Sequence, residues 1–153
     1  MAARVLETLA GRGETLATAE SLTGGLLCSR LTDVPGASRS FVGGVVSYAT
    51  RVKVSLLGVP PEVVQEHGVV SQECARAMAE GVRERLDATW GLATTGVAGP
   101  DEQEGRAVGT GWVAIAGPAG ATARLLQLGG DRATIRHASC DAVLEILARE
   151  LGD

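Results

Sequence analysis

The sequence predicts a single three-layer α/β/α domain, residues 1–153, built on a mixed sheet that includes one β-hairpin. Short apolar runs typical of strands alternate along the chain with segments of helical periodicity, which is the pattern of an α/β protein. Two consecutive strand-like runs flank Pro118-Ala119-Gly120, which predicts a hairpin within the alternating order. A length of 153 residues is that of one ordinary domain, and the sequence contains no repeat or linker.

Helix signals mark six segments of the chain. Glycine ends the first helix at Gly11 or Gly13, Gly24-Gly25 opens the second, and Pro35-Gly36 closes it. Two prolines start the fourth helix, and Ser71 is a good N-cap for the fifth. We therefore expect helices, in chain order, over residues 3–11, 24–34, 51–58, 61–68, 72–87 and 132–150.

Five segments have the composition of strands. They are rich in valine, alanine and leucine, and turn residues bound them. We expect these strands over residues 15–21, 40–50, from 90 into a glycine-rich turn, 108–117 and 122–129. Ligands of open α/β sheets bind outside the carboxyl ends of strands. Three polar or glycine-rich segments follow strands here, namely Glu20–Gly25, Tyr48–Lys53 and Thr94–Pro100.

Composition excludes several classes of function. The net charge of −4, the four aromatic residues and the lack of an arginine cluster argue against a nucleic-acid groove. No apolar run reaches the roughly 18 residues of a membrane span, and the N-terminus is too polar for a signal peptide. Cys28, Cys74 and Cys140 lie far apart, which favours small buried residues in a reducing cytoplasm over a metal site.

The chain contains 13 arginines and one lysine, Lys53. Arginine stays protonated, whereas a lysine in a desolvated site can lose its proton near neutral pH. The lone lysine is therefore either the one that a compositional bias towards arginine missed, or an amine that the function requires.

The segment Ala19–Gly25 runs from a strand into the start of a helix. Free backbone N–H groups and the positive helix end favour an anion there, and Gly24 and Gly25 allow close approach. Ser21 and Thr23 can add hydroxyl donors, and Glu20 can hold a ribose hydroxyl. The alternative is a plain N-cap with a glycine turn.

The segment from Ser38 to Lys53 holds the only Phe, Tyr and Lys of the chain. Tyr48 and Lys53 are five residues apart across a predicted strand-to-helix turn, so both can lie at one end of the sheet. A serine in the loop before the strand could meet them there, and a Ser/Lys pair can hydrolyse an amide without histidine. The alternatives are a strand-end aromatic for Tyr48 and a turn residue for Ser38.

Two further groups are candidates for substrate binding. Thr94, Thr95, Gly96 and Gly99 follow a strand and suit a pocket wall or an anion-binding nest, although a tight glycine turn explains them equally well. Arg132 lies at a helix start, where the dipole disfavours a cation, so either a ligand phosphate compensates it or it belongs to a solvated face.

Five segments, taken in order, resemble one known family. AESLTGG, GGVVSYATRVKVSLLGV, TTGVAGP, VGTGWVAI and GDRATIR are similar to motifs of the CinA C-terminal domain, the nicotinamide-mononucleotide amidase family. The resemblance implies hydrolysis of the carboxamide to nicotinate mononucleotide and ammonia, by a Ser/Lys-type mechanism with an assisting tyrosine and no metal or cofactor. It places these roles on Ser38, Tyr48 and Lys53, with Ser40 as the rival serine.

The sequence also departs from the family pattern. Thr50 and Arg51 stand where the family often has Asn and Glu, and Arg106 stands where it usually has Lys, after an acidic stretch. A nucleotide-binding regulatory module with little catalysis is therefore the alternative, and a partner in DNA uptake ranks last. We expect a cytoplasmic homo-oligomer that binds a small-molecule nucleotide, and neither nucleic acid nor a membrane.

Overall fold

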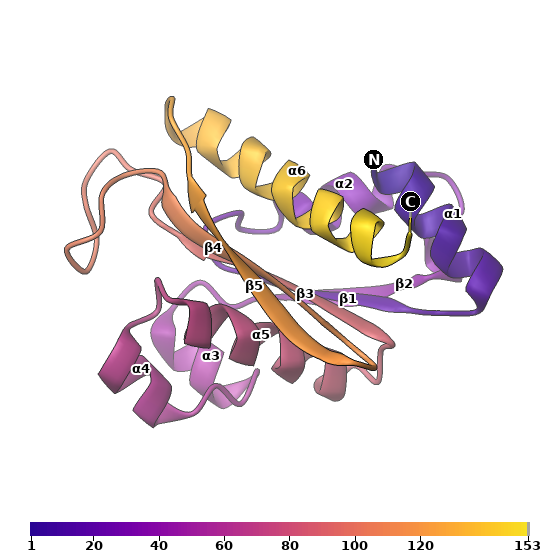
Figure 1. The fold of residues 1–153 in the computed structure, drawn as a ribbon, viewed down its shortest axis with the longest axis horizontal. Helices are drawn as coiled ribbons and strands as arrows, with labels where there is room; N and C mark the ends of the chain where they lie inside the picture. The colour runs from indigo at the N-terminus through magenta and orange to yellow at the C-terminus, as the bar shows by residue number, and fades with distance from the viewer. Residues whose placement is uncertain (153) are drawn as a thin grey trace.

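A computed structural model describes residues 1–152 as three layers around one sheet (Figure 1). The strands are β1 (Leu16–Glu20), β2 (Phe41–Val46), β3 (Trp90–Gly96), β4 (Thr110–Gly117) and β5 (Gly120–Gln127). The helices are α1 (Ala2–Arg12), α2 (Leu26–Thr32), α3 (Thr50–Ser55), α4 (Pro61–His67), α5 (Gln72–Arg85) and α6 (Arg132–Glu150). The predicted α/β/α domain with its hairpin is confirmed.

The strand order β2-β1-β3-β4-β5 gives a mixed sheet. β1 pairs in parallel with both β2 and β3, whereas β4 and β5 join as an antiparallel hairpin beside β3. The carboxyl ends of β1, β2 and β3 therefore lie at one edge of the sheet, where α/β proteins place their ligands.

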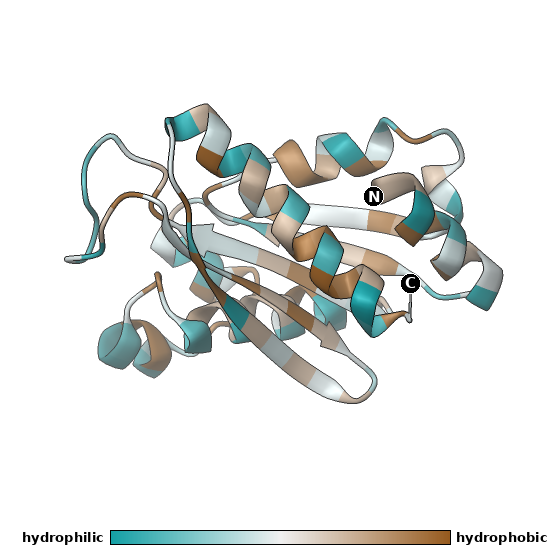
Figure 2. Cartoon of the chain, turned by 45° about the horizontal axis from the view of Figure 1, so that its top comes forward, coloured by the Kyte–Doolittle hydropathy of each residue, from teal (hydrophilic) through white to brown (hydrophobic). Residues whose placement is uncertain are grey.

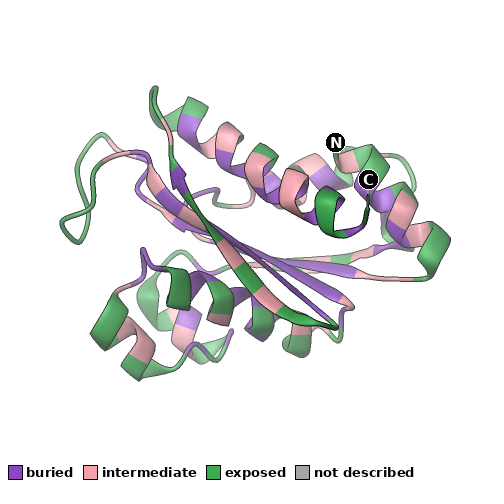
Figure 3. Cartoon of the chain, in the orientation of Figure 1, coloured by how far each residue is buried: buried purple, intermediate pink, exposed green. Residues whose placement is uncertain are grey.

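Two apolar layers hold the helices on the sheet. On one face, leucines and valines of α1, α2 and α6 pack against Leu16, Leu92 and Val113. On the other face, α5 packs against small residues of the sheet such as Ala17 and Ala93. Hydrophobic residues lie along the sheet-facing sides of the helices (Figure 2), and the central strands are buried while β5 is largely exposed (Figure 3).

Glycine explains how closely α5 approaches the sheet. A Cβ on Gly91 of β3 would lie 2.1 Å from the carbonyl oxygen of Ala79 in α5, so only glycine fits there. The predicted N-cap Ser71 is also confirmed, because its side chain accepts from the backbone N–H of Cys74, and Asp131 caps α6 in the same way through the N–H of Thr134. None of the helices within residues 1–152 is long and apolar enough to cross a membrane.

Candidate active site

A cavity of about 320 Å³ opens at the carboxyl ends of β1 and β3. Its lining contains seven of the predicted site residues, namely Ser21, Tyr48, Lys53, Thr95, Gly96, Gly99 and Arg132. Val69, Val70 and residues 101–103, which the sequence did not point to, complete the wall. The structure therefore gathers these seven residues at the sheet edge where the sequence led us to expect a site.

Lys53 is the largest fully buried side chain among residues 1–152, with 1% of its surface exposed. It lies on α3, and its Nζ is 2.9 Å from Ser21 Oγ, 2.7 Å from the Ser47 carbonyl oxygen and 3.2 Å from the Tyr48 carbonyl oxygen. Burial lowers the pKa of Lys53 below its ordinary value of 10.5, because desolvation disfavours the ammonium form. No carboxylate forms an ion pair with this amine within the part of the chain described by the structure.

Lys53 Nζ donates to Ser21 Oγ and to two carbonyl oxygens, which matches the three N–H groups of the ammonium form. The same geometry also suits the neutral form once one proton has left. A neutral amine has two N–H groups and one lone pair, and the two carbonyl oxygens can only accept. They therefore take the two N–H groups, which leaves the lone pair facing the Ser21 hydroxyl. In that protonation state Ser21 donates to Lys53, which is the arrangement of a nucleophile and its general base.

Ser38 does not meet Lys53, so that expectation is wrong. Ser38 is exposed in a short 3-10 helix, Ala37–Arg39, which precedes β2, whereas Lys53 follows β2. The six residues of β2 separate the two by roughly 20 Å at about 3.3 Å per residue. Ser40 lies at the same far end, where it is buried and donates to the Leu6 carbonyl oxygen at 3.1 Å.

The backbone N–H groups at the start of α2 already bind a carboxylate of the protein, that of Glu20. Glu20 is fully buried, and its carboxylate accepts from the backbone N–H groups of Gly25, Leu27 and Cys28 at 2.9, 3.0 and 2.7 Å. The charge that the sequence assigned to a ligand phosphate is thus supplied internally. The expectation of a phosphate site there, with Glu20 free to hold a ribose, is contradicted.

Four more predicted binding residues form part of this buried turn and do not line the cavity. Thr23 Oγ1 lies 2.6 Å from Thr94 Oγ1, and both side chains are fully buried. Gly24 and Gly25 have left-handed backbone conformations, with φ of 57° and 100°, and shape the turn. None of these four residues lines the cavity, since contacts within the protein already use them.

We expect Glu20→Gln to destabilise the fold by about 2–4 kcal/mol, because a charged acceptor of three N–H groups becomes an amide that accepts on one side only. Urea unfolding at neutral pH measures the loss. Glu80→Gln, on an exposed position of α5, is the matched control and should stay within about 0.5 kcal/mol of wild type. Equal stability of Glu20→Gln and Glu80→Gln would contradict the structural role of Glu20.

Tyr48 and Arg132 form the mouth of the cavity. The Tyr48 side chain is exposed, and its hydroxyl accepts from Arg132 Nη2 at 3.3 Å. Arg132 Nη1 donates to the Gly99 carbonyl oxygen at 2.6 Å. Lys53 contacts Tyr48 through the backbone carbonyl oxygen, 3.2 Å away, and not through the hydroxyl. The tyrosine hydroxyl is thus paired with a guanidinium at the entrance.

Two of the three departures from the family pattern, Thr50 and Arg106, have different locations. Thr50 lines the cavity, whereas Arg106 is exposed in the loop after β3 and outside the lining. The backbone of Arg106 pairs with that of Gln103 in a tight turn. Arg106 therefore does not line the cavity.

Cys74 and Cys140 are buried, as the sequence predicted, whereas Cys28 is only partly buried. Burial raises the pKa values of the Cys28, Cys74 and Cys140 thiols to about 12, 11 and 12, so the thiols are protonated at neutral pH. Within residues 1–152 no cluster of three His, Cys, Asp or Glu side chains could hold a metal ion. The amine and the hydroxyl in the cavity are thus the groups suited to nucleophilic chemistry.

Comparisons with known proteins agree with this architecture. The chain matches the family model described as the CinA C-terminal domain over residues 1–151. It is 55% identical over 147 residues to a CinA-like protein of Frankia casuarinae and 47% identical over 140 residues to a putative competence-damage inducible protein of Desulforamulus reducens. These alignments cover 96% and 92% of this chain but 34% of each relative, so the chain spans about a third of their length.

Two crystal structures have the same fold. A CinA superfamily protein from Klebsiella pneumoniae superposes with a TM-score of 0.96 at 29% identity, over 99% of this chain and 95% of that one. The competence/damage inducible protein CihA from Agrobacterium tumefaciens gives a TM-score of 0.93 at 33% identity, over 99% and 93%. With a family match along nearly its whole length, the chain belongs to the family of CinA C-terminal domains.

Proposed function

We propose that this domain is an amidohydrolase that converts nicotinamide mononucleotide into nicotinate mononucleotide and ammonia. One observation carries the proposal: the buried Lys53 amine lies 2.9 Å from Ser21 Oγ, inside a cavity large enough for part of a nucleotide. Desolvation lowers the pKa of this amine, which is what a lysine needs to act as a general base near neutral pH. The identity of the proposed substrate comes from the family resemblance.

In the proposed mechanism, neutral Lys53 removes the proton of the Ser21 hydroxyl while Oγ attacks the carboxamide carbon. Backbone N–H groups of the cavity wall stabilise the oxyanion of the tetrahedral intermediate. The Lys53 ammonium then protonates the leaving nitrogen, the C–N bond breaks, and ammonia departs from the acyl-enzyme. Lys53 next takes a proton from a water molecule while the water oxygen attacks the acyl carbon. The Lys53 ammonium returns that proton to Ser21 Oγ as the C–O bond to Ser21 breaks, which releases the acid and restores the neutral amine. The sum is amide plus water giving acid plus ammonia.

Arg132 is the residue that we assign to the phosphate of the substrate. It stands at the mouth of the cavity, one of its nitrogens is 3.3 Å from the Tyr48 hydroxyl, and guanidinium groups bind phosphate oxygens with paired donors. Arg132 thus takes the place of the start of α2 as the proposed phosphate site, because the Glu20 carboxylate already binds the backbone N–H groups there.

The proposal predicts ammonia release from nicotinamide mononucleotide, and much slower release from free nicotinamide, which lacks the phosphate that Arg132 would hold. A coupled ammonia assay on the purified domain measures both rates. Equal rates on the two amides would contradict the role of Arg132 but not the amidohydrolase chemistry.

The second candidate is a nucleotide-binding regulatory module, which the departures at Thr50 and in the loop 101–107 favour. Calorimetry distinguishes it from the enzyme. Binding of the mononucleotide without ammonia release over a long incubation would support the module and reject the amidohydrolase.

A further inference from the structure

We propose that Glu104 is a positioning residue that clasps the loop 101–107, here called the clasp loop, onto Val69 and so closes one wall of the substrate cavity. This inference rests on the proposed function, because it assigns Glu104 a role in binding the substrate of that site. Glu104 itself does not line the cavity.

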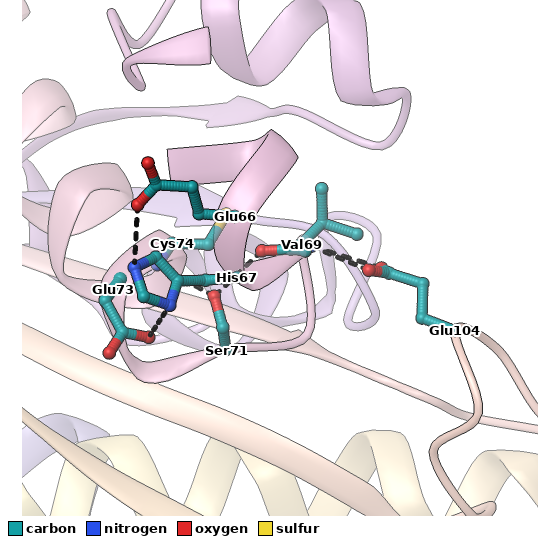
Figure 4. Close-up of polar contacts among 8 residues, drawn as sticks. Glu66, His67, Val69, Ser71, Glu73, Cys74 and Glu104 are labelled. Atoms are coloured by element: carbon teal, nitrogen blue, oxygen red, sulfur yellow. Dashed lines mark hydrogen bonds and ion pairs between the residues drawn. The ribbon is translucent and has the colours of Figure 1, made fainter. Parts of the chain in front are cut away.

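The clasp is a hydrogen bond shared by both oxygens of one carboxylate. Glu104 Oε1 and Oε2 each lie 3.1 Å from the backbone nitrogen of Val69, which donates to them (Figure 4). The two residues are 35 positions apart, so this contact joins the clasp loop to the segment between α4 and α5. Hydrogen bonds to a charged acceptor are stronger than those between neutral groups.

Val69 is held from its other side by a cavity residue. Thr95 is 1% exposed, and its hydroxyl donates to the Val69 carbonyl oxygen at 2.7 Å. Val69 and Thr95 both line the cavity, as do residues 101–103 of the clasp loop. The N–H and the carbonyl of one residue thus tie three segments of the cavity wall together.

The local backbone is shaped for this contact. Gly68 has a φ of +75°, and a Cβ there would lie 2.0 Å from Glu104 Oε2, so a side chain would displace the carboxylate. Glu104 also has a positive φ of 52°, in a tight turn closed by the backbone groups of Gln103 and Arg106. A left-handed conformation is unfavourable for glutamate and persists where surrounding contacts determine it.

The catalytic pair is held by other contacts. Ser21 follows β1 and donates its backbone N–H to the Thr94 carbonyl oxygen, while Lys53 is fixed by the carbonyl groups of Ser47 and Tyr48. Release of the clasp should therefore open the wall and weaken substrate binding without moving the reacting groups. Burial lowers the pKa of Lys53 and the Glu104 carboxylate raises it, so kcat is compared at a pH where Lys53 is neutral in every variant, and the expected signature there is a raised KM with an unchanged kcat.

The test compares Glu104→Ala, Glu104→Gln and the control Glu80→Gln in the intact domain. We expect KM for nicotinamide mononucleotide to rise about tenfold in Glu104→Ala and about threefold in Glu104→Gln, which keeps one acceptor oxygen, with kcat within about twofold of wild type. Glu80→Gln should match wild type. A fall in kcat at constant KM, or equal KM in all four proteins, would overturn the proposal.

Limited digestion with trypsin gives a readout that needs no turnover. The bond after Arg106 lies in the exposed clasp loop, and it should be cleaved at least about fivefold faster in Glu104→Ala than in wild type, with other arginine sites unaffected. Equal cleavage would reject the clasp. If the wild type released no ammonia, the proposed function would fail, while digestion would still decide whether Glu104 holds the loop.

Discussion

Replacing Ser21 with alanine is expected to lower kcat for nicotinamide-mononucleotide hydrolysis at least about a thousandfold, since the residual rate would depend on substrate binding and oxyanion stabilisation alone. Ser21 Oγ is the hydroxyl that faces the buried amine of Lys53, at 2.9 Å. The substitution removes one atom and leaves the turn intact, because the backbone N–H of Ser21 makes its own bond to the Thr94 carbonyl oxygen.

Ser38→Ala is the matched control for this loss. Ser38 is exposed at the opposite end of β2 from the cavity, so its activity should stay within about twofold of wild type, as for an ordinary surface substitution. Ammonia release under saturating substrate measures both variants, and circular dichroism checks that each is folded. Loss of activity in Ser38→Ala together with an active Ser21→Ala would contradict the assignment of the nucleophile.

Replacement of Lys53 should have an effect of similar size. Lys53→Met shortens the unbranched side chain by one atom and removes the base, and should lower kcat at least about a hundredfold. Lys53→Arg should be equally inactive, because a guanidinium stays protonated and cannot accept the serine proton. Arg51→Met, which removes a cation from an exposed position of α3, is the control and should keep its activity. A fully active Lys53→Arg would exclude the general-base role.

The same lysine sets the expected pH dependence. Because its pKa is lowered by burial, the fraction of neutral amine and the rate should rise with pH through a midpoint below 10.5. The unfolded chain binds this proton more tightly than the folded protein, so the free energy of unfolding of wild type should rise relative to that of Lys53→Met between the lowered pKa and 10.5. The comparison with Lys53→Met cancels the contribution of the three cysteine thiols, whose raised pKa values lower stability as the pH rises above about 9. A rate that is independent of pH across this interval would contradict a neutral Lys53 as the base.

Much of the fold could be predicted because its signals are local. Glycine at residue 13 ends α1, and Ser71 and Asp131 cap their helices through their own side chains. The order of strands and helices also predicted the sheet edge at which Lys53 and Ser21 meet, since the carboxyl ends of parallel neighbours share one edge.

The pairing of serine and lysine required three-dimensional information. Ser38 is nearer to Lys53 in the chain, but an extended strand separates the two, whereas Ser21 ends the neighbouring parallel strand. A rule that loops before and after one strand lie at opposite ends of it would have excluded Ser38 and favoured Ser21.

Two other features also depended on the fold. The N–H groups that open α2 looked like a ligand site because nothing local shows that Glu20 turns back to accept them. The contact of the clasp loop could not be predicted because its partner, the Val69 backbone, is 35 residues away from Glu104. In both cases the carboxylate accepts from specific backbone N–H groups that no local sequence pattern marks.

Rapid acid quenching during turnover, followed by tryptic peptide mapping, tests the central claim most directly. If Ser21 is the nucleophile, an acyl group derived from the substrate will be found on the peptide of residues 13–30, which contains Ser21, and fragmentation will place it on that residue. The peptide of residues 31–39, which contains Ser38, will remain unmodified. An acyl group on Ser38, or ammonia release with no acylated Ser21 at any quench time, would contradict the Ser21–Lys53 mechanism.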